Sequence, residues 1–175
     1  MFCSALKNLG EIVLFDVVPG LAEGKALDIL EAMPVSKSDV KITGGTDYAL
    51  SKDSDIVVVT AGVARKPGMT RDDLININSV IVKSVVEEAV KYSPNCILVV
   101  VTNPLDNMVK LAYEISGFPK NRVIGMAGVL DTARFKTFVA METGASVRDI
   151  EAMVLGGHGD SMVPVLNSCT VKNVP

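Results

Sequence analysis

One histidine in this chain could carry acid-base chemistry near neutral pH. His158 is the only histidine, so an imidazole can transfer protons at no other position. It stands in the segment Gly156-Gly157-His158-Gly159-Asp160, whose small residues leave the ring open to a ligand. An incidental histidine of a surface loop is the alternative. The segment therefore predicts a general acid or base, with that alternative left open.

A carboxylate and a guanidinium stand three residues apart in a segment that is predicted to be helical. Asp131 and Arg134 would share one helix face, where the carboxylate could orient a histidine and the guanidinium could form a two-pronged pair with a substrate carboxylate. A local ion pair within the helix is the simpler explanation of these two residues taken by themselves.

Two arginines flank a Pro-Gly pair that is typical of a hinged lid. Thr70 and Asp73 have the spacing of a capping box, which places Arg71 in the first turn of a helix. The helix dipole disfavours a cation there, so Arg71 would favour an anionic partner. Either Arg71 or Arg65 could equally be a solvated surface charge.

Two polar residues follow directly after apolar runs. Asp16 follows Ile12–Phe15, where a dinucleotide-binding fold places the carboxylate that binds the adenosine ribose and disfavours NADP; a turn residue explains this aspartate more simply. Asn103 could cap the next helix, with Pro104 at the first helical position, or its amide could bind a ligand. Both explanations of Asn103 are equally supported.

Short apolar runs alternate with longer helical patterns, which is typical of βαβ units and a parallel sheet. The strands are apolar at consecutive positions, which predicts that helices cover both faces of the sheet. After about residue 127 the alternation fades, and a second domain is predicted to begin. The predicted strands are Ile12–Phe15, 40–43 (near an edge), Ile56–Val59 and 96–101, and the predicted helices are 21–33, 71–90, one that ends at Gly117 and one from about Val129 to Gly144.

Composition excludes several classes of protein. The 17 Lys and Arg and 20 Asp and Glu give a net charge of −3 without a basic block, which disfavours nucleic-acid and anionic-lipid partners. The longest apolar run, residues 96–101, is far shorter than the roughly 20 residues needed to span a membrane. The three cysteines lack metal-type spacing and fit a reducing compartment. We therefore expect a cytoplasmic protein with no metal site and no membrane or nucleic-acid partner.

Four segments together resemble the lactate/malate dehydrogenase family, in its order and spacing. They are Val63-Ala64-Arg65-Lys66-Pro67-Gly68-Met69-Thr70-Arg71-Asp72-Asp73-Leu74, Val101-Thr102-Asn103-Pro104, Leu130-Asp131-Thr132-Ala133-Arg134 and Gly156-Gly157-His158-Gly159-Asp160. Each motif is modest, but four in register are highly specific. The resemblance covers nearly the whole chain. The surface-charge explanations given above lose most of their weight.

The resemblance implies NAD-dependent interconversion of malate and oxaloacetate, a reaction of the tricarboxylic acid cycle. His158 would take the hydroxyl proton of malate while hydride leaves, and Asp131 would stabilise the resulting imidazolium. Arg134 would bind the carboxylate beside the reacting carbon, and Arg71 would polarise the substrate carbonyl. The implied cofactor residues are Asp16, Asn78, Val101, Thr102 and Asn103, of which Asn103 also holds substrate.

Arg65 would select the substrate. Lactate dehydrogenases carry Gln at the matching position, whereas a second substrate carboxylate needs a cation. Malate is therefore favoured over lactate or another 2-hydroxy acid. A non-catalytic α/β module is a third hypothesis. Family members are homodimers or homotetramers, which implies the same for the full-length form.

The chain departs from the family at both ends. It contains no Gly-x-Gly-x-x-Gly loop about 20 residues before Asp16, and it stops at Pro175. In a sheet ordered 3-2-1-4-5-6, the first strand is central, so its absence would leave the strands at 12–15 and 56–59 without a shared neighbour. We expect a partial Rossmann-type sheet in residues 1–126, the start of an α+β substrate domain in 127–175, and poor NAD binding with little turnover by this polypeptide on its own.

Overall fold

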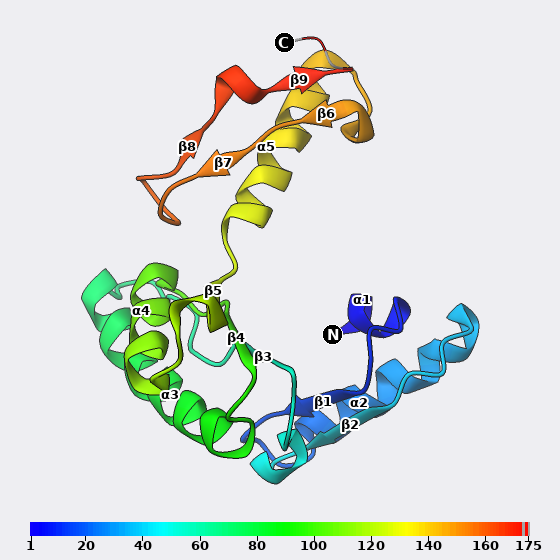
Figure 1. The fold of residues 1–175 in the computed structure, drawn as a ribbon, viewed down its shortest axis with the longest axis vertical. Helices are drawn as coiled ribbons and strands as arrows, with labels where there is room; N and C mark the ends of the chain where they lie inside the picture. Colours follow the sequence, from blue (N-terminus) through cyan, green and yellow to red (C-terminus); the bar gives the residue numbers. More distant parts are fainter. Residues whose placement is uncertain (173, 175) are drawn as a thin grey trace. The chain divides into compact units, whose positions relative to one another are not determined.

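The computed structural model describes residues 1–172 and 174, which divide into two compact units. One unit contains Met1–Asp55 and Glu88–Cys96, and the other contains Ile56–Glu87 and the chain from Ile97 onward. The helices are α1 (Phe2–Leu6), α2 (Leu21–Ala32), α3 (Arg71–Tyr92), α4 (Leu105–Ser116) and α5 (Gly128–Thr143). The strands are β1 (Ile12–Phe15), β2 (Ile42–Gly45), β3 (Ile56–Val59), β4 (Ile97–Val100), β5 (Val123–Gly125), β6 (Ile150–Glu151), β7 (Val154–Leu155), β8 (Val163–Pro164) and β9 (Thr170–Val171) (Figure 1).

In the first unit, α2 packs against a parallel pair of strands, β1 and β2. The approach is close because β2 carries Gly44, where a Cβ atom would lie 2.2 Å from the carbonyl oxygen of Ala22. Beside this contact a small apolar core forms, made of Ala5, Ala26, Met33, Val40 and Ile42. The strand predicted at residues 40–43 is wrong by two residues, since Val40 is a buried core residue that precedes β2.

In the second unit, β3, β4 and β5 form a parallel sheet in that order. The parallel, alternating arrangement predicted from the sequence is confirmed. One face of this sheet is buried through Leu98, Val100 and Val123, and α4 packs on β4 and β5. Figure 1 shows α3 on the same side as α4, and the buried residues of α3 recur at helical spacing.

The prediction that helices cover both faces of the sheet is wrong for these described strands. Ile56 and Val58 point to the opposite face from the buried residues, and they are 59% and 56% exposed. Ile124 of β5 lies on the same face and is also exposed. Apolar residues at consecutive positions therefore show that both faces of a strand could be buried. In the part of the chain that the structure describes, helices pack on only one face of this sheet.

The strands predicted at 12–15 and 56–59 appear in the structure as β1 and β3. Among the described residues, β1 pairs with β2 only, and β3 pairs with β4 only. The β1–β2 pair and the β3–β4–β5 sheet are therefore separate sheets, and no other described strand pairs with the outer edges of either.

Two predicted helix ends are confirmed, and one predicted helix start is wrong. Gly117 and Gly144 follow α4 and α5 with φ of 63° and 68°, the left-handed conformation that favours glycine. At the start of α4, the N-cap is Pro104 with extended backbone, and no side chain caps the helix. Asn103 is therefore not a cap, and Pro104 is not the first helical residue.

After β5, helix α5 packs against β6 and β7. The short strands pair antiparallel, β6 with β9 and β7 with β8. This change from parallel to antiparallel pairing agrees with the different sequence pattern after residue 127. It brings the segment that carries His158, which follows β7, next to the first turns of α5.

Candidate active site

The first turn of α3 is capped as the sequence predicts. The amide and the hydroxyl of Thr70 donate to Oδ2 of Asp73 at 2.9 and 2.6 Å, and the amide of Asp73 donates to the hydroxyl of Thr70 at 3.0 Å. These hydrogen bonds, first the one from the hydroxyl and then the one from the amide, hold the pKa of Asp73 below its ordinary value. The capping box fixes the helix start and places Arg71, an exposed cation, in the first turn.

Protonation of Asp73 should therefore undo this helix start only in strong acid. Because the pKa of Asp73 is lowered in the folded chain, its stabilising effect is complete above the ordinary value of 3.8 and is lost as the pH falls through the lowered value. NMR titration of the Thr70 amide should show a midpoint below 3.8. Asp73→Asn should show no such transition, and a midpoint at or above the ordinary value would contradict the assignment.

The segment before α3 is folded back on itself, with its arginine at the surface. Nε of Arg65 donates to the carbonyl oxygen of Met69 at 3.1 Å, and the amide of Met69 donates to the carbonyl oxygen of Lys66 at 3.1 Å. Gly68 permits this turn because its φ is 85°. Within the described residues, only Nε of Arg65 forms a hydrogen bond, so the two terminal guanidinium nitrogens can form a two-pronged pair with a carboxylate.

Asn78 of α3 joins this segment to the end of β4. Its side chain is 1% exposed, its Oδ1 accepts from the amide of Val63 at 2.8 Å, and its Nδ2 donates to the carbonyl oxygens of Val63 at 3.2 Å and Asn103 at 2.6 Å. Gly62 leaves room for this amide, since a Cβ atom there would lie 3.1 Å from Oδ1 of Asn78. Both donors of the Asn78 amide are thus used on the backbone, which makes it a joint between two segments.

Thr102 adds a second joint between the ends of β3 and β4. Its buried hydroxyl donates to the carbonyl oxygen of Ala61 at 2.7 Å. Val101 continues the parallel pairing, because its amide donates to the carbonyl oxygen of Val59 at 2.9 Å. The side chain of Asn103, by contrast, is exposed at the carboxyl end of β4 and its backbone is the part that Asn78 holds. The Asn103 side chain is therefore exposed to solvent, while its backbone carbonyl group is fixed by the hydrogen bond from Asn78.

We expect Asn78→Ala to loosen the arginine-bearing segment more than it weakens cofactor binding. The Val63 amide and two carbonyl groups would lose their partner, so amide hydrogen exchange at Val63 should become at least about tenfold faster, a loss of ~1.4 kcal/mol of protection. Asn78→Asp keeps an acceptor for Val63 and should retain most of that protection. Unchanged amide exchange at Val63 in Asn78→Ala would contradict the role of Asn78 in holding this segment.

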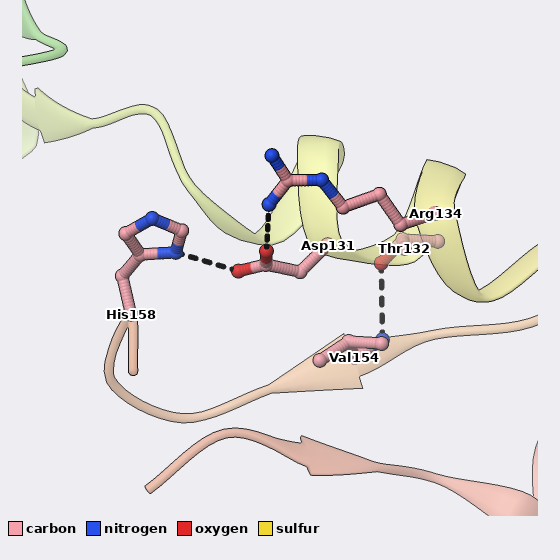
Figure 2. A network of polar contacts seen from close by, with 5 residues as sticks. All are labelled: Asp131, Thr132, Arg134, Val154 and His158. Atoms are coloured by element: carbon pink, nitrogen blue, oxygen red, sulfur yellow. Dashed lines mark hydrogen bonds and ion pairs between the residues drawn. The ribbon is translucent and has the colours of Figure 1, made fainter. Parts of the chain in front are cut away.

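The first turns of α5 and the segment after β7 form a compact polar network (Figure 2). Nδ1 of His158 lies 2.8 Å from Oδ2 of Asp131, and Nη1 of Arg134 lies 3.3 Å from Oδ1 of the same carboxylate. The Asp131 side chain is 5% exposed, against 23% for His158 and 59% for Arg134. The Asp131 carboxylate thus pairs with the histidine and also forms the local ion pair with Arg134, while the pairing of Arg134 with a substrate carboxylate stays a prediction.

This geometry prepares His158 for proton transfer. A carboxylate at Nδ1 favours the tautomer with its proton there, which leaves Nε2 as the atom that can accept a proton. Nε2 points away from Asp131 in Figure 2. Asp131 is buried, and its carboxylate contacts the ring directly at Nδ1. The arrangement can therefore accept a proton from a ligand and stabilise the imidazolium that forms.

A cavity of about 490 Å³ lies beside His158, lined mainly by α4 and the region of β5 and the start of α5. Its polar lining side chains are Asp106, Lys110, Tyr113, Lys120 and His158. Arg65, Arg71, Asn103 and Arg134 do not line it. The described contacts thus form two groups, one around Asn78 and one around Asp131, and no hydrogen bond or ion pair between described residues links them.

Asp16 belongs to the other unit and directly follows β1, as predicted. Its Oδ1 accepts from the amide of Val18 at 2.9 Å, which orients the carboxylate and leaves Oδ2 for a second partner. Nearby in this unit, the rings of Phe15 and Tyr48 stack with their centroids 3.8 Å apart. Burial, and second the charge of Glu88, raise the pKa of Tyr48.

Within residues 1–172 and 174, no three His, Cys, Asp or Glu side chains gather where they could hold a metal ion. No helix in that same part of the chain has both the length and the apolar character needed to cross a membrane.

Both parts of the chain match domains of one known protein family. Residues 2–125 match the lactate/malate dehydrogenase NAD binding domain, and residues 128–175 match the lactate/malate dehydrogenase alpha/beta C-terminal domain. The chain belongs to the lactate/malate dehydrogenase family. Its first part is thus the NAD-binding α/β domain of this family, and its second part is the start of the C-terminal α/β domain, as the sequence predicted.

The chain is similar to several malate dehydrogenases. It is 59% identical over 172 residues to malate dehydrogenase of Geotalea uraniireducens, a match that covers 98% of this chain and 54% of the relative. Among solved structures, it is similar to apo malate dehydrogenase of Picrophilus torridus, with a TM-score of 0.95 and 50% identity over 99% of this chain and 55% of that one.

Lactate dehydrogenase of Cryptosporidium parvum, solved with lactic acid and NAD, is also similar. The TM-score is 0.93 at 44% identity, over 99% of this chain and 55% of that protein. The chain therefore spans about half the length of the relatives it matches. Since both substrate classes share this fold, the fold of the family does not by itself select malate.

Proposed function

We propose that the protein containing this chain is an NAD-dependent oxidoreductase that interconverts malate and oxaloacetate. The observation that carries the proposal is the buried Asp131 carboxylate at Nδ1 of His158, with Nε2 left free. The names of the relatives, malate dehydrogenases at 53% to 60% identity, support the same activity.

In this proposal His158 moves the proton of the reaction. Nε2 takes the hydroxyl proton of malate, and in the reverse direction the protonated ring returns it to the carbonyl oxygen of oxaloacetate. Asp131 stabilises the imidazolium across the 2.8 Å contact at Nδ1. The bound nicotinamide supplies the hydride chemistry that accompanies this proton transfer.

Three arginines would hold and polarise the substrate. Arg134 contacts Asp131 through Nη1 only, so its other edge is available for a two-pronged pair with the carboxylate beside the reacting carbon. Arg71 would polarise the carbonyl, and Arg65 would bind the second carboxylate with its terminal nitrogens. Asn103 would hold substrate or the nicotinamide ribose through its exposed amide.

The residues present fit parts of the NAD molecule. Asp16 has one carboxylate oxygen oriented by Val18 and one that can accept from a ribose hydroxyl. The side chains of Asn78 and Thr102 are used in hydrogen bonds to backbone carbonyl groups. The segment Val101–Asn103 would therefore contact the nicotinamide side of the cofactor through its backbone groups and through the Asn103 amide. Asn78 would serve the cofactor through the position of that backbone.

A lactate or other 2-hydroxy-acid substrate is the second candidate, supported by the similarity to lactate dehydrogenase of Cryptosporidium parvum. Arg65 favours malate, because a buried second carboxylate without a cation would cost several kcal/mol. The exposed position of the Arg65 side chain leaves it free to meet that carboxylate. A non-catalytic module is disfavoured by the paired Asp131 and His158.

We further propose a division into residues 1–126 for NAD binding and 127–175 for the start of the substrate domain. The full-length protein would be a cytoplasmic homodimer or homotetramer. Cys3 and Cys169 are free thiols in the structure, which fits a reducing compartment. Light scattering of the purified protein would give its oligomeric state.

The proposed function is tested by NADH oxidation with the protein expressed from its own gene. Oxaloacetate should support saturable turnover, and pyruvate should give a kcat/KM at least about a hundredfold lower, as expected when one charge-assisted pair is missing. Equal or better turnover with pyruvate would favour the lactate alternative. Absence of turnover with any 2-oxo acid, despite NADH binding, would overturn the proposal.

A further inference from the structure

Thr132 connects the helix that carries Asp131 to the strand that precedes His158. Its Oγ1 accepts a hydrogen bond from the amide of Val154 at 3.0 Å (Figure 2). Thr132 is the next residue after Asp131 on α5, and Val154 begins β7, which runs directly into the Gly156-Gly157-His158 segment. One hydroxyl therefore ties together the two elements whose side chains form the Asp131 and His158 pair.

A second observation places the same strand against the same helix. Val154 is buried, and a Cβ atom at Gly128 in the first turn of α5 would lie 3.4 Å from its carbonyl oxygen. The backbone of Val154 thus faces α5 closely, with its amide on the Thr132 hydroxyl. The other side of β7 pairs with β8, where Val154 lies opposite Pro164. A proline has no amide hydrogen, so it cannot donate to β7.

We propose that Thr132 is a positioning residue that sets the distance between Asp131 and His158, an inference that rests on the proposed function. His158 follows Val154 by four residues along the chain. A shift of β7 along α5 moves the ring away from Oδ2 of Asp131, where the present separation is 2.8 Å. Displacements of about 1 Å in a catalytic arrangement cost up to about a hundredfold in rate.

Thr132→Val tests the proposal because valine has nearly the same shape but no acceptor. In the protein expressed from its own gene, we expect kcat for oxaloacetate reduction to fall about tenfold or more, since the ring and the carboxylate are less well placed. The dissociation constant for NADH should stay within about twofold, since the NAD-binding domain is untouched. Thr132→Ser keeps an acceptor and should restore most of kcat.

Thr137→Val is the matched control on the same helix. The hydroxyl of Thr137 donates only to the carbonyl oxygen of Ala133 within α5. The same chemical change there should leave kcat within about twofold of the parent protein, because it breaks no link to another element. A similar loss of kcat in Thr137→Val would show an effect of helix stability and would overturn the positioning role.

A double substitution separates positioning from a general loss of structure. If Thr132 acts through His158, adding Thr132→Val to His158→Asn should lower the residual rate by less than about threefold, because residues that act as a unit are not additive. A full additional tenfold loss would overturn the proposal. So would a normal kcat in Thr132→Val, or a loss that Thr132→Ser fails to restore.

Amide hydrogen exchange tests the position of β7 without depending on enzymatic activity, so it separates this inference from the proposed function. Exchange at Val154 should be faster in Thr132→Val and close to that of the parent in Thr132→Ser and Thr137→Val. If the parent protein turns over no 2-oxo acid, the proposed function fails, whereas this exchange pattern still shows whether Thr132 positions β7. Unchanged exchange at Val154 in Thr132→Val would overturn the positioning itself.

Discussion

His158→Asn is expected to lower kcat for oxaloacetate reduction about a thousandfold, because it removes the general acid and base. Asparagine has no group that changes its protonation near neutral pH, so the proton must come from water. The NADH dissociation constant should change little. The expected result is therefore a protein that binds cofactor and fails at the chemical step, measured by NADH fluorescence and by stopped-flow oxidation in the same preparation.

Asp131→Asn provides the matched comparison for this prediction. It keeps the size of the side chain but removes the charge that lies 2.8 Å from the ring. Asparagine can also donate to Nδ1, which would favour the wrong tautomer of His158. Its kcat should therefore fall substantially as well, and the two losses should not add in the double variant. Near-normal kcat in His158→Asn would exclude the imidazole as the proton carrier.

Arg65→Gln is expected to change the substrate preference of the protein. The kcat/KM for oxaloacetate should fall about a hundredfold, because losing a charge-assisted pair and leaving one carboxylate unmatched costs ~3 kcal/mol. The kcat/KM for pyruvate should stay the same or rise, since pyruvate carries a methyl group where oxaloacetate carries the second carboxylate. Steady-state kinetics with both 2-oxo acids measures the ratio directly.

Lys66→Gln is the control for the charge of the segment. It removes one positive charge from the adjacent position while the Nε contact of Arg65 with Met69 is retained. We expect the ratio of the two substrates to change by less than about threefold in this variant, as for a solvent-exposed charge at a distance. An Arg65→Gln protein that gained pyruvate activity without losing oxaloacetate activity would contradict the role of Arg65 in selecting malate.

Local patterns in the sequence were sufficient for several elements of the site. The Thr70 and Asp73 capping box, the glycines that follow α4 and α5, and the strand that directly precedes Asp16 all appear as predicted. Each depends on residues within one turn or one strand, where spacing and backbone preferences are decisive. The four motifs in register also identified the family, and the matches to its two domains confirm this.

Other features depend on contacts between distant segments. For these, the sequence either allowed two interpretations or predicted the wrong one. Asn103 looked equally suited to capping and to ligand binding, and only the backbone at Pro104 excludes the cap. The apolar strand sequences predicted that helices cover both faces of the sheet, yet Ile56 and Val58 lie on an exposed face. Apolar character records which surfaces can be buried, while burial itself depends on which elements pack there.

The two positioning contacts of the site were decided by tertiary structure. Asn78 accepts from Val63 across 15 residues, and Thr132 accepts from Val154 across 22 residues. Asparagine and threonine side chains can hydrogen-bond to many backbone groups, so neither shows in the sequence which distant backbone group it contacts. The sequence by itself determined the residue types that can do the chemistry and the elements that carry them. Only the packing of α3 and α5 against their neighbouring segments decided which hydrogen bonds hold those residues in place, because such partners are defined by distance in space and not along the chain.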